Sequence, residues 1–429
     1  MTTCWPMVNA LARGVVSRHP LPPGRLIALD AEERKNQRLL LELAARHGPV
    51  FKAVAWGQLW VCVVGLDRCT RFIHEHKGRI RPATIDVTRL YPEGFLRQMR
   101  GEAHRRSRKA LVLALRDEAV AQQTDALAGI AATRLAGYAR RFPAGSALSV
   151  EALIATLSEI ASVQLIRVFF GEPDGSPLAE RLLAGFRALG PHGLVWNQGP
   201  RQEAAFHALR TMIRDDLRER PAAVGGVVRR LHAAGALDEA MLGHAIMMVE
   251  MGRYDMKGFY RWLLRYAGQH PATIDRIADE PDAEPAAGNS RARAFVLETF
   301  RMDQSERLIR RAEQDLVFDG FIIPRHAMIR LCLWESHKSE VYFPEPFVFN
   351  PERFRDGDLP ADRFAPFGLD EHYCPLADVA IRLGVLLVRE VARRYRIESV
   401  GDGAPIRGAY GWEPAPTFTV RLYPREEPA

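Results

Sequence analysis

Cysteine is scarce in this sequence, and the few cysteines follow no pattern. The 429 residues include five of them, an odd number, and no two stand in C-x-x-C spacing. The five are Cys4, Cys62, Cys69, Cys332 and Cys374. This set argues against a disulfide framework and against a structural zinc site. It indicates instead a protein that works in a reducing compartment.

The chain also lacks any segment that would divide it. It has no glycine- or serine-rich linker, no low-complexity tract and no repeat. Its length by itself favours about two or three domains. Helical patterns dominate, however, and a hydrophobic content of 47% supports a sizeable core. We therefore predict one large domain over residues 1–429.

A long apolar run is missing from the N-terminus. Residues 1–24 contain an apolar stretch that Arg13 interrupts and that His19 and Pro20 close. Such a stretch is too short to span a bilayer, and the segment lacks the charged start and the cleavage site of a signal peptide. We expect a soluble, cytoplasmic protein without a membrane anchor.

Positive charge is in modest excess. The formal net charge of +7 is by itself compatible with nucleic-acid binding. The arginines are spread over many helical segments, however, and no basic tail or aromatic interleaving accompanies them. A solvated basic surface explains the excess better, so no nucleic-acid partner is predicted.

The stretch that carries the most chemistry is FAPFGLDEHYCPLA, residues 364–377. It places Cys374 just before a pattern of helical period. A thiolate at that position gains from the helix dipole and from free backbone N–H groups, and it is a ligand for a soft or borderline metal. From these residues alone, a small buried hydrophobic side chain is an equally good interpretation of Cys374.

The stretch resembles the haem-ligand loop of the cytochrome P450 family, F-G-x-G-x-[HR]-x-C-x-G. The matching positions carry Phe367, Gly368, His372 and Cys374. Asp370 and Leu376 replace two glycines of the pattern. The resemblance implies haem b with the Cys374 thiolate as axial ligand, and Phe367 and His372 as further haem contacts. It also implies a mainly α fold with small β-sheets, in which the haem lies between a long central helix and the cysteine loop.

A second segment fits the same family. His104 and Arg108 stand four residues apart within Met99–Leu115 and share one helical face. Without the resemblance, a basic helical surface is the better interpretation. The family places H-x-x-x-R here and uses both side chains to hold a haem propionate. Arg310 matches the strand arginine that binds the other propionate, with Arg311 as a second candidate.

A third segment supplies a charged network. The helical pattern of Arg291–Met302 puts Glu298 and Arg301 on one face. The E-x-x-R spacing recurs elsewhere in the chain, so its value lies in the segments after it: strand-like residues to 333 and then the motif F-N-P-E-R-F, which contains Arg353. The resemblance implies a structural triad of Glu298, Arg301 and Arg353. It places the β-rich part at about 48–65 and 306–333, and the helical part at about 100–302 and 374–395.

The central helix, predicted over 236–269, departs from the family. The family's oxygen-activation motif, [AG]-G-x-[DE]-T-T, falls on residues 251–256, and only Gly252 matches. Tyr254 replaces the acid, Asp255 replaces the first threonine, and Met256 replaces the second threonine, whose hydroxyl group serves oxygen activation in the family. Methionine cannot supply a proton.

Three explanations of that departure remain open. Asp255 or Tyr254 relays protons; a polar group of the substrate completes the relay; or hydrogen peroxide is the oxidant and Arg253 anchors a carboxylate. The alternative for Arg253 is an outward-facing residue paired with Glu250. Met248, Met251 and Met256 are candidate substrate contacts, although methionines on a helix are more often core residues.

The resemblance implies a haem-thiolate monooxygenase that oxidises a small, specialised-metabolite-like molecule. Its electrons would come from NAD(P)H through a reductase and a separate ferredoxin or flavodoxin. The altered helix motivates two alternatives: a peroxide-dependent or non-hydroxylating enzyme (coupling, rearrangement or dehydration), and a haem-binding protein without turnover. In the family, segments that here fall on 77–95 and 190–200 cover the substrate pocket.

Overall fold

The computed structural model of the chain describes most of its residues. They are residue 12 and the ranges 17–83, 87, 89–91, 94–116, 118–190, 199–220, 225–281, 290–303, 307–357, 359–360, 362–408 and 411–425. Most of residues 1–24, and most of the connection predicted over 190–200, lie outside these ranges.

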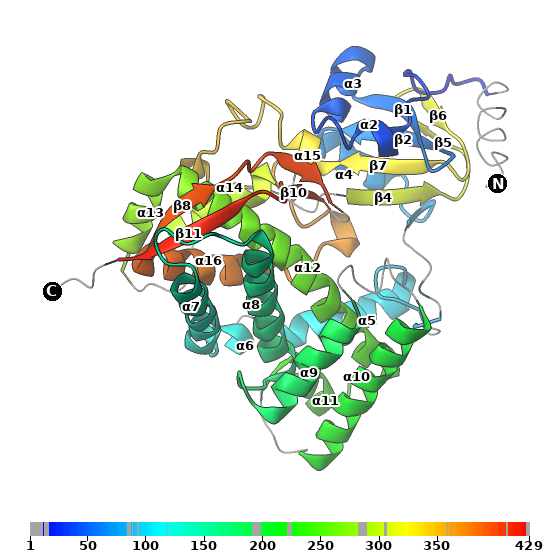
Figure 1. Ribbon diagram of the computed structural model, residues 1–429. Coiled ribbons are helices and arrows are strands. Elements are labelled where there is room, and N and C mark those ends of the chain that lie inside the picture. The colour runs from blue at the N-terminus through cyan, green and yellow to red at the C-terminus, as the bar shows by residue number, and fades with distance from the viewer. Residues whose placement is uncertain are drawn as a thin grey trace.

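Five strands form a mixed sheet at one corner of the molecule (Figure 1). In sheet order they are β1 (Val50–Ala55), β2 (Gln58–Val64), β7 (Met328–Cys332), β4 (Arg307–Ala312) and β3 (Ile80–Pro82). β2 pairs with β7 in parallel, and the other pairs are antiparallel. β5 (Leu316–Phe318) and β6 (Phe321–Ile323) form a separate hairpin. Apart from β3, these strands lie within the parts of the chain that we predicted to be β-rich.

The rest of the described chain is mainly helical, as predicted. The helices are α2 (Leu29–Glu32), α3 (Leu39–His47), α4 (Leu66–Glu75), α5 (Gly101–Ala114), α6 (Glu118–Ala121), α7 (Thr124–Arg141), α8 (Val150–Phe170), α9 (Pro177–Ala188), α10 (Pro200–Glu219), α11 (Val227–Ala233), α12 (Glu239–Gln269), α13 (Pro271–Ala278), α14 (Arg291–Met302), α15 (Leu333–Ser336) and α16 (Ala377–Arg394), with 3-10 turns η1 (Pro351–Phe354) and η2 (Asp370–His372). Four of them begin at a capping side chain that accepts a first-turn N–H: Ser149, Ser176, Asp238 and Ser290 for α8, α9, α12 and α14.

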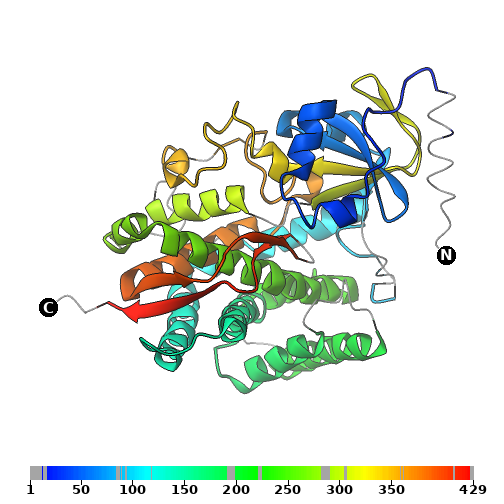
Figure 2. The same ribbon diagram turned by 45° about the horizontal axis from the view of Figure 1, so that its top comes forward.

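Two strand pairs follow the last helix. β8 (Tyr395–Val400) pairs with β11 (Thr419–Pro424), and β9 (Pro405–Arg407) pairs with β10 (Trp412–Pro414). The C-terminal pair, red in Figure 2, runs along the helical part and contacts α12. We did not predict these strands.

Helix α12 is the longest element and packs closely on its neighbours. At Gly252 a Cβ would lie 3.0 Å from a methyl carbon of Leu165, so the glycine lets α8 approach α12. At Gly384 of α16 a Cβ would lie 2.8 Å from the ring of Phe259, so this glycine makes room for an α12 side chain. These close approaches hold α12 between the helices that surround it.

Among the described residues, α8 is the one helix that is long and apolar enough to cross a bilayer. Two thirds (67%) of its most apolar window is buried within the protein. Twelve of its residues have buried side chains, including Leu153, Leu157 and Phe169. Its apolar character is therefore used in packing the core.

Candidate functional site

Cys374 lies in the loop between η2 and α16, held by backbone hydrogen bonds. Its own N–H donates to the carbonyl oxygen of Phe367 at 2.9 Å, and the N–H of Leu376 donates to its sulfur. Burial raises the pKa of the Cys374 thiol to about 11, opposed by the Leu376 N–H and by the cations Arg108 and Arg97. In the absence of a bound cation the buried sulfur therefore keeps its proton.

The backbone of this loop explains its two departures from the family pattern. Gly368 has a φ of 91° and Asp370 a φ of 64°, so both adopt the left-handed conformation for which glycine is the default residue. Aspartate is one of the few other residues that tolerate it. Leu376 has a φ of −101°, which any residue adopts, and its side chain is buried in the core. The loop shape thus survives both substitutions.

We expect replacement of Gly368 by alanine to destabilise the protein by about 1–2 kcal/mol, because its Cβ strains the left-handed backbone. A Cβ there meets only the His372 carbonyl oxygen, at 3.8 Å, so steric overlap contributes little. Asp370→Gly relieves comparable strain and should leave stability equal or raise it by less than about 1 kcal/mol. Urea unfolding measures both changes, and similar losses in the two variants would contradict this account of the turn.

Stacked aromatic rings connect the cysteine loop to the central helix. The Phe367 ring lies edge-on to Phe300 of α14, with centroids 4.7 Å apart. Phe300 stacks in parallel on Phe259 of α12 at 3.7 Å. The position of the loop relative to α12 is therefore fixed through rigid side chains.

Basic side chains from three elements meet beside Cys374. The rings of His104 (α5) and His372 (η2) are 4.7 Å apart. Arg310 of β4 is 3% exposed, and one of its terminal nitrogens has no hydrogen-bond partner within the described part of the chain. Burial, and then the nearby Arg97, lowers the pKa of Arg310 to about 10. Burial and the charge of Arg310 lower the pKa of His372 to about 3. Arg108 belongs to the same basic cluster, because its charge lowers the pKa of both histidines.

Sequence reasoning missed Arg97. It precedes α5, burial lowers its pKa, and it interacts electrostatically with both Asp255 and Cys374. It therefore extends the basic cluster toward the thiol. In the sequence, Arg97 is marked only as the single charged residue of the stretch Phe95–Met99.

This donor set fits haem b. The two carboxylates of the group would neutralise basic side chains that are crowded and incompletely hydrogen-bonded. The iron would replace the proton of Cys374, because a thiol that binds a metal is deprotonated. The residues that would hold the group are Cys374, Arg97, His104, Arg108, Arg310, His372 and Phe367.

One side of α12 is open toward this cluster. Met248 and Met251 are partly exposed and Asp255 is exposed, whereas most other residues of the helix are buried. The charge of Asp255 raises the pKa of Cys374 and acts on Arg97, so the carboxylate lies on the side that faces the thiol. Met256 is 5% exposed and packs in the core, because one residue rotates a helix position by about 100°. Of these two neighbours, Asp255 therefore lies on the open face of α12, whereas the Met256 side chain is packed in the core.

Arg253 and Tyr254 point elsewhere and are engaged in a buried network. The Arg253 guanidinium donates to Glu250 at 2.7 and 3.1 Å, to the carbonyl oxygen of Gly190 at 2.8 Å and to the Tyr254 hydroxyl at 2.9 Å. The Tyr254 hydroxyl also donates to the Gly190 carbonyl. The Glu250 pairing was our alternative for Arg253, but the residue is buried, not outward-facing. Both side chains are thus engaged in a buried network and do not lie on the open face with Asp255.

The structure brings Glu298, Arg301 and Arg353 together. Two nitrogens of Arg301 donate to the two oxygens of Glu298 at 2.7 and 2.8 Å, and Arg353 lies 3.5 Å from Glu298. Glu298 and Arg301 are fully buried. Arg301 also donates to the carbonyl oxygens of His337 and Pro346, which joins α14 to the segment that follows α15.

Replacing Glu298 by glutamine is expected to destabilise the protein by about 3–5 kcal/mol, because Arg301 then keeps a buried charge without its partner. Glu102 and Arg105 have the same spacing and a 2.8 Å ion pair, but both are exposed. Glu102→Gln is therefore the matched control, with an expected change within about 0.5 kcal/mol. Chemical unfolding of both variants tests this, and equal effects would contradict it.

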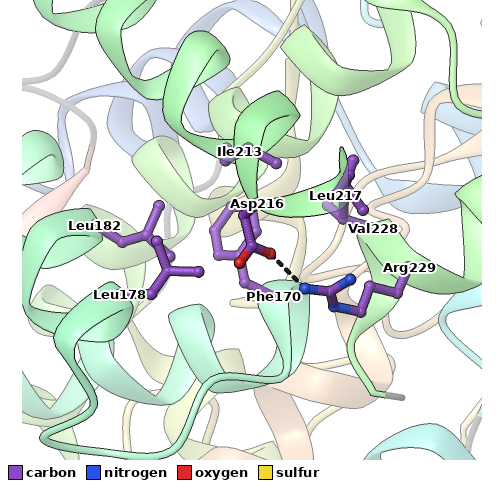
Figure 3. A pocket seen from close by; sticks show the side chains of 8 residues that line it. All are labelled: Phe170, Leu178, Leu182, Ile213, Asp216, Leu217, Val228 and Arg229. Carbon is purple, nitrogen blue, oxygen red and sulfur yellow. Dashed lines mark hydrogen bonds and ion pairs between the residues drawn. The ribbon is translucent and has the colours of Figure 1, made fainter. Parts of the chain in front are cut away.

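A small hollow lies on elements that carry none of these residues. Figure 3 shows apolar side chains of α8, α9, α10 and α11 around the ion pair of Asp216 and Arg229. It has room for little more than one water molecule. We therefore assign it to imperfect helix packing.

Comparison with known proteins bears on the family and the fold of the chain. A family model described as Cytochrome P450 matches residues 292–405. Abscisic acid 8'-hydroxylase 1 of Oryza sativa subsp. japonica is 22% identical over 88% of this chain and 85% of its own length. Abscisic acid 8'-hydroxylase 2 of Arabidopsis thaliana is 28% identical, over 38% of this chain and 37% of its own length.

A solved structure shows the same fold. It is retinoic acid bound cyanobacterial CYP120A1, which superposes with a TM-score of 0.77 at 18% identity and covers 95% of this chain and 100% of its own. The cofactor of the matched family is haem b with a cysteine thiolate ligand. The family model, a relative aligned over most of its length and the shared fold together support a cytochrome P450, a family of haem-thiolate monooxygenases.

Proposed function

We propose that the protein oxidises a small apolar organic molecule and that Cys374 is the thiolate ligand of its haem. Haem bound in this way activates dioxygen and supplies one oxygen atom to a substrate carbon. The observation that carries the proposal is the placement of Cys374, with a basic cluster beside it and Asp255 of α12 within electrostatic reach. No other described cysteine has such surroundings: Cys62, Cys69 and Cys332 are buried in the sheet region.

The basic cluster binds and orients the cofactor in this proposal. His104, Arg108 and Arg310 hold the propionates, with His372 and Arg97 beside them, since planar arginine donors suit carboxylates. Phe367 packs against the ring system from the loop side. The triad of Glu298, Arg301 and Arg353 maintains the architecture of the α14 region.

Asp255 is the residue that we propose moves a proton on the substrate side. Within the described part of α12, it is the one carboxylate on the open face. A carboxyl group both accepts and donates a proton, so it replaces the alcohol of the family motif. Met248 and Met251 line the substrate side, where thioether chains adapt to an irregular apolar ligand.

The names of the relatives support a proposal for the substrate class. The relatives aligned with this chain include abscisic acid 8'-hydroxylases and an ent-kaurenoic acid oxidase, and the solved neighbour is bound to retinoic acid. We propose a largely apolar carboxylic acid or a closely related molecule. Electrons come from NAD(P)H through a reductase and a separate ferredoxin or flavodoxin, in the cytoplasm.

The test combines spectroscopy with turnover. The reduced, carbon-monoxide-bound protein should show the absorption band of thiolate-ligated haem. Retinoic acid and abscisic acid should shift the ferric spin state, and turnover with ferredoxin, reductase and NAD(P)H should give a hydroxylated product. A band typical of a neutral or displaced sulfur would refute the ligation, and absence of product with every donor would leave a haem-binding protein without turnover.

Peroxide use is a second candidate, and the carboxylate of Asp255 favours it. An acid–base group near the bound oxidant assists cleavage of peroxide, with water as the second product. Turnover with hydrogen peroxide in place of ferredoxin and NAD(P)H distinguishes the two. Coupling, rearrangement or dehydration would appear as a product that has gained no oxygen atom.

A further inference from the structure

His244 of α12 is a buried polar group that nothing in the preceding mechanism uses. Its side chain is 0% exposed. Neither imidazole nitrogen has a hydrogen-bond partner in the part of the chain that the structure describes. A buried polar atom without a partner costs about 1–3 kcal/mol, and such groups in native proteins require a specific explanation.

The position of His244 on the helix relates it to the site. The spacing 244, 248, 251, 255 is that of one helical face. Met248, Met251 and Asp255 are the open residues of α12 described above, so His244 is in line with them at the N-terminal end. At 1.5 Å per residue, His244 lies about 16 Å along the axis from Asp255.

Aromatic rings cover the imidazole. Tyr91 stacks on His244 at 5.9 Å between centroids with an interplanar angle of 18°, and Phe95 lies at 6.1 Å. The Tyr91 hydroxyl donates to the carbonyl oxygen of Gly243 at 3.0 Å. A Cβ at Gly243 would lie 2.9 Å from the Tyr91 ring, so this glycine admits the ring onto the helix. The ring of Phe206 of α10 lies 5.4 Å from the ring of Tyr91. We call Tyr91, Phe95 and Phe206 the aromatic box.

The aromatic box therefore surrounds the imidazole of His244, which is neutral, with apolar side chains. Burial lowers the pKa of His244 to about 4, so the ring is uncharged near neutral pH. A neutral imidazole offers one N–H donor and one acceptor nitrogen. Its complement is an oxygen group: a hydroxyl group or a protonated carboxyl group both accepts and donates, and a carboxylate accepts from the N–H.

We propose that His244 anchors the oxygen-bearing end of the substrate, whose apolar body extends along Met248 and Met251 so that the carbon to be oxidised lies near Asp255. The proposal rests on the proposed function and names its substrate class: elongated apolar molecules with a terminal carboxyl or hydroxyl group about 16 Å or less from the oxidised carbon. Because Tyr91 and Phe95 cover the imidazole, the end group reaches it when these two rings part. The hydrogen bonds gained then offset the cost of the unpaired nitrogens.

The experiment uses the haem-loaded enzyme and two probes, retinoic acid and its analogue with a methyl group in place of the carboxyl. Binding is measured by the spin-state shift. His244→Leu should weaken binding of retinoic acid about 10-fold, which corresponds to about 1.4 kcal/mol, because the buried oxygen group of the ligand then lacks its hydrogen-bond partner. It should leave binding of the methyl analogue unchanged. KM for the acid should rise more than kcat falls, because an anchor contributes to ground-state and transition-state binding alike.

Two further variants keep the test decisive. His244→Gln retains one donor and one acceptor and should preserve most of the preference for the acid. Met247→Leu changes another fully buried residue of α12 and should affect both probes equally little. Equal losses for the acid and its methyl analogue in His244→Leu, or no loss, would overturn the proposal.

The failure of this proposal is distinguishable from failure of the proposed function. A normal thiolate band without a spin-state shift by retinoic acid in the unmodified enzyme would refute the elongated-acid class alone. Absence of the thiolate band would refute the proposed function itself.

Discussion

Replacing Cys374 by serine is expected to abolish the thiolate band of the reduced, carbon-monoxide-bound protein and to reduce turnover to the level of a control without enzyme. Cys374 is the described cysteine that lies beside the basic cluster, and its sulfur accepts the Leu376 N–H. Serine keeps the size of the side chain but offers an alcohol, which is a poor ligand for haem iron beside a cysteine thiolate. The absorption spectrum and a product assay measure the two effects.

Cys62 provides the matched control. It is fully buried in β2, and no basic cluster surrounds it among the residues that the structure describes. Cys62→Ala should keep the thiolate band and the turnover, with a loss of stability of about 1–3 kcal/mol from the cavity it leaves. An unchanged spectrum in Cys374→Ser would show that another group binds the iron.

Replacing Asp255 by asparagine is expected to lower turnover by about 10²–10⁴-fold while the haem spectrum and ligand binding stay normal. That range is typical for the loss of a general acid or base. Asparagine has nearly the same shape but gives up no proton, so the loss isolates proton transfer from packing. Asp255→Thr should recover part of the dioxygen-driven activity, because its hydroxyl donates. The measurement is product formed per NAD(P)H consumed, with and without hydrogen peroxide.

Met256→Thr is the control that distinguishes two rotations of α12, one with Asp255 facing the site and one with Met256 facing it. Met256 is packed in the core, so a shorter side chain with a buried hydroxyl should cost about 2–5 kcal/mol of stability. The ratio of product to NAD(P)H should not change. If Met256→Thr changed that ratio and Asp255→Asn did not, the orientation assigned to α12 would be refuted.

The rotation of α12, which puts Asp255 and not Met256 on the open face, also shows which features could be predicted from the sequence. Helix α14, the cysteine loop and the order of the strands are visible as local patterns, because each depends on neighbouring residues. The direction of Asp255 is not visible, since the motif on α12 retains one glycine and gives no independent register. Packing of Gly252 against Leu165 fixes that rotation, and it is a contact between distant segments.

Arg97 and His244 could not be recognised from the sequence for a related reason. Each is a single titratable residue among uncharged neighbours, and its role depends on contacts with elements that are distant in the sequence. The strands after α16 pair residues that lie close along the chain, but they are short and lie beyond the last motif. Their pairing depends on packing against α12 more than on an alternating pattern of their own.

The network of Glu250, Arg253 and Tyr254 gives the altered motif a structural role, because it connects α9 to α12. Both donors hold the carbonyl of Gly190 at the end of α9, so that end is tethered to the same helical turn that bears Asp255. We therefore expect a displacement of α9 to shift the turn of α12 that carries the Asp255 carboxylate. Arg253 and Tyr254, which we aligned with the oxygen-activation motif of the family, thus connect α12 to the end of α9, and the neighbouring Asp255 is the acid that we propose moves the proton.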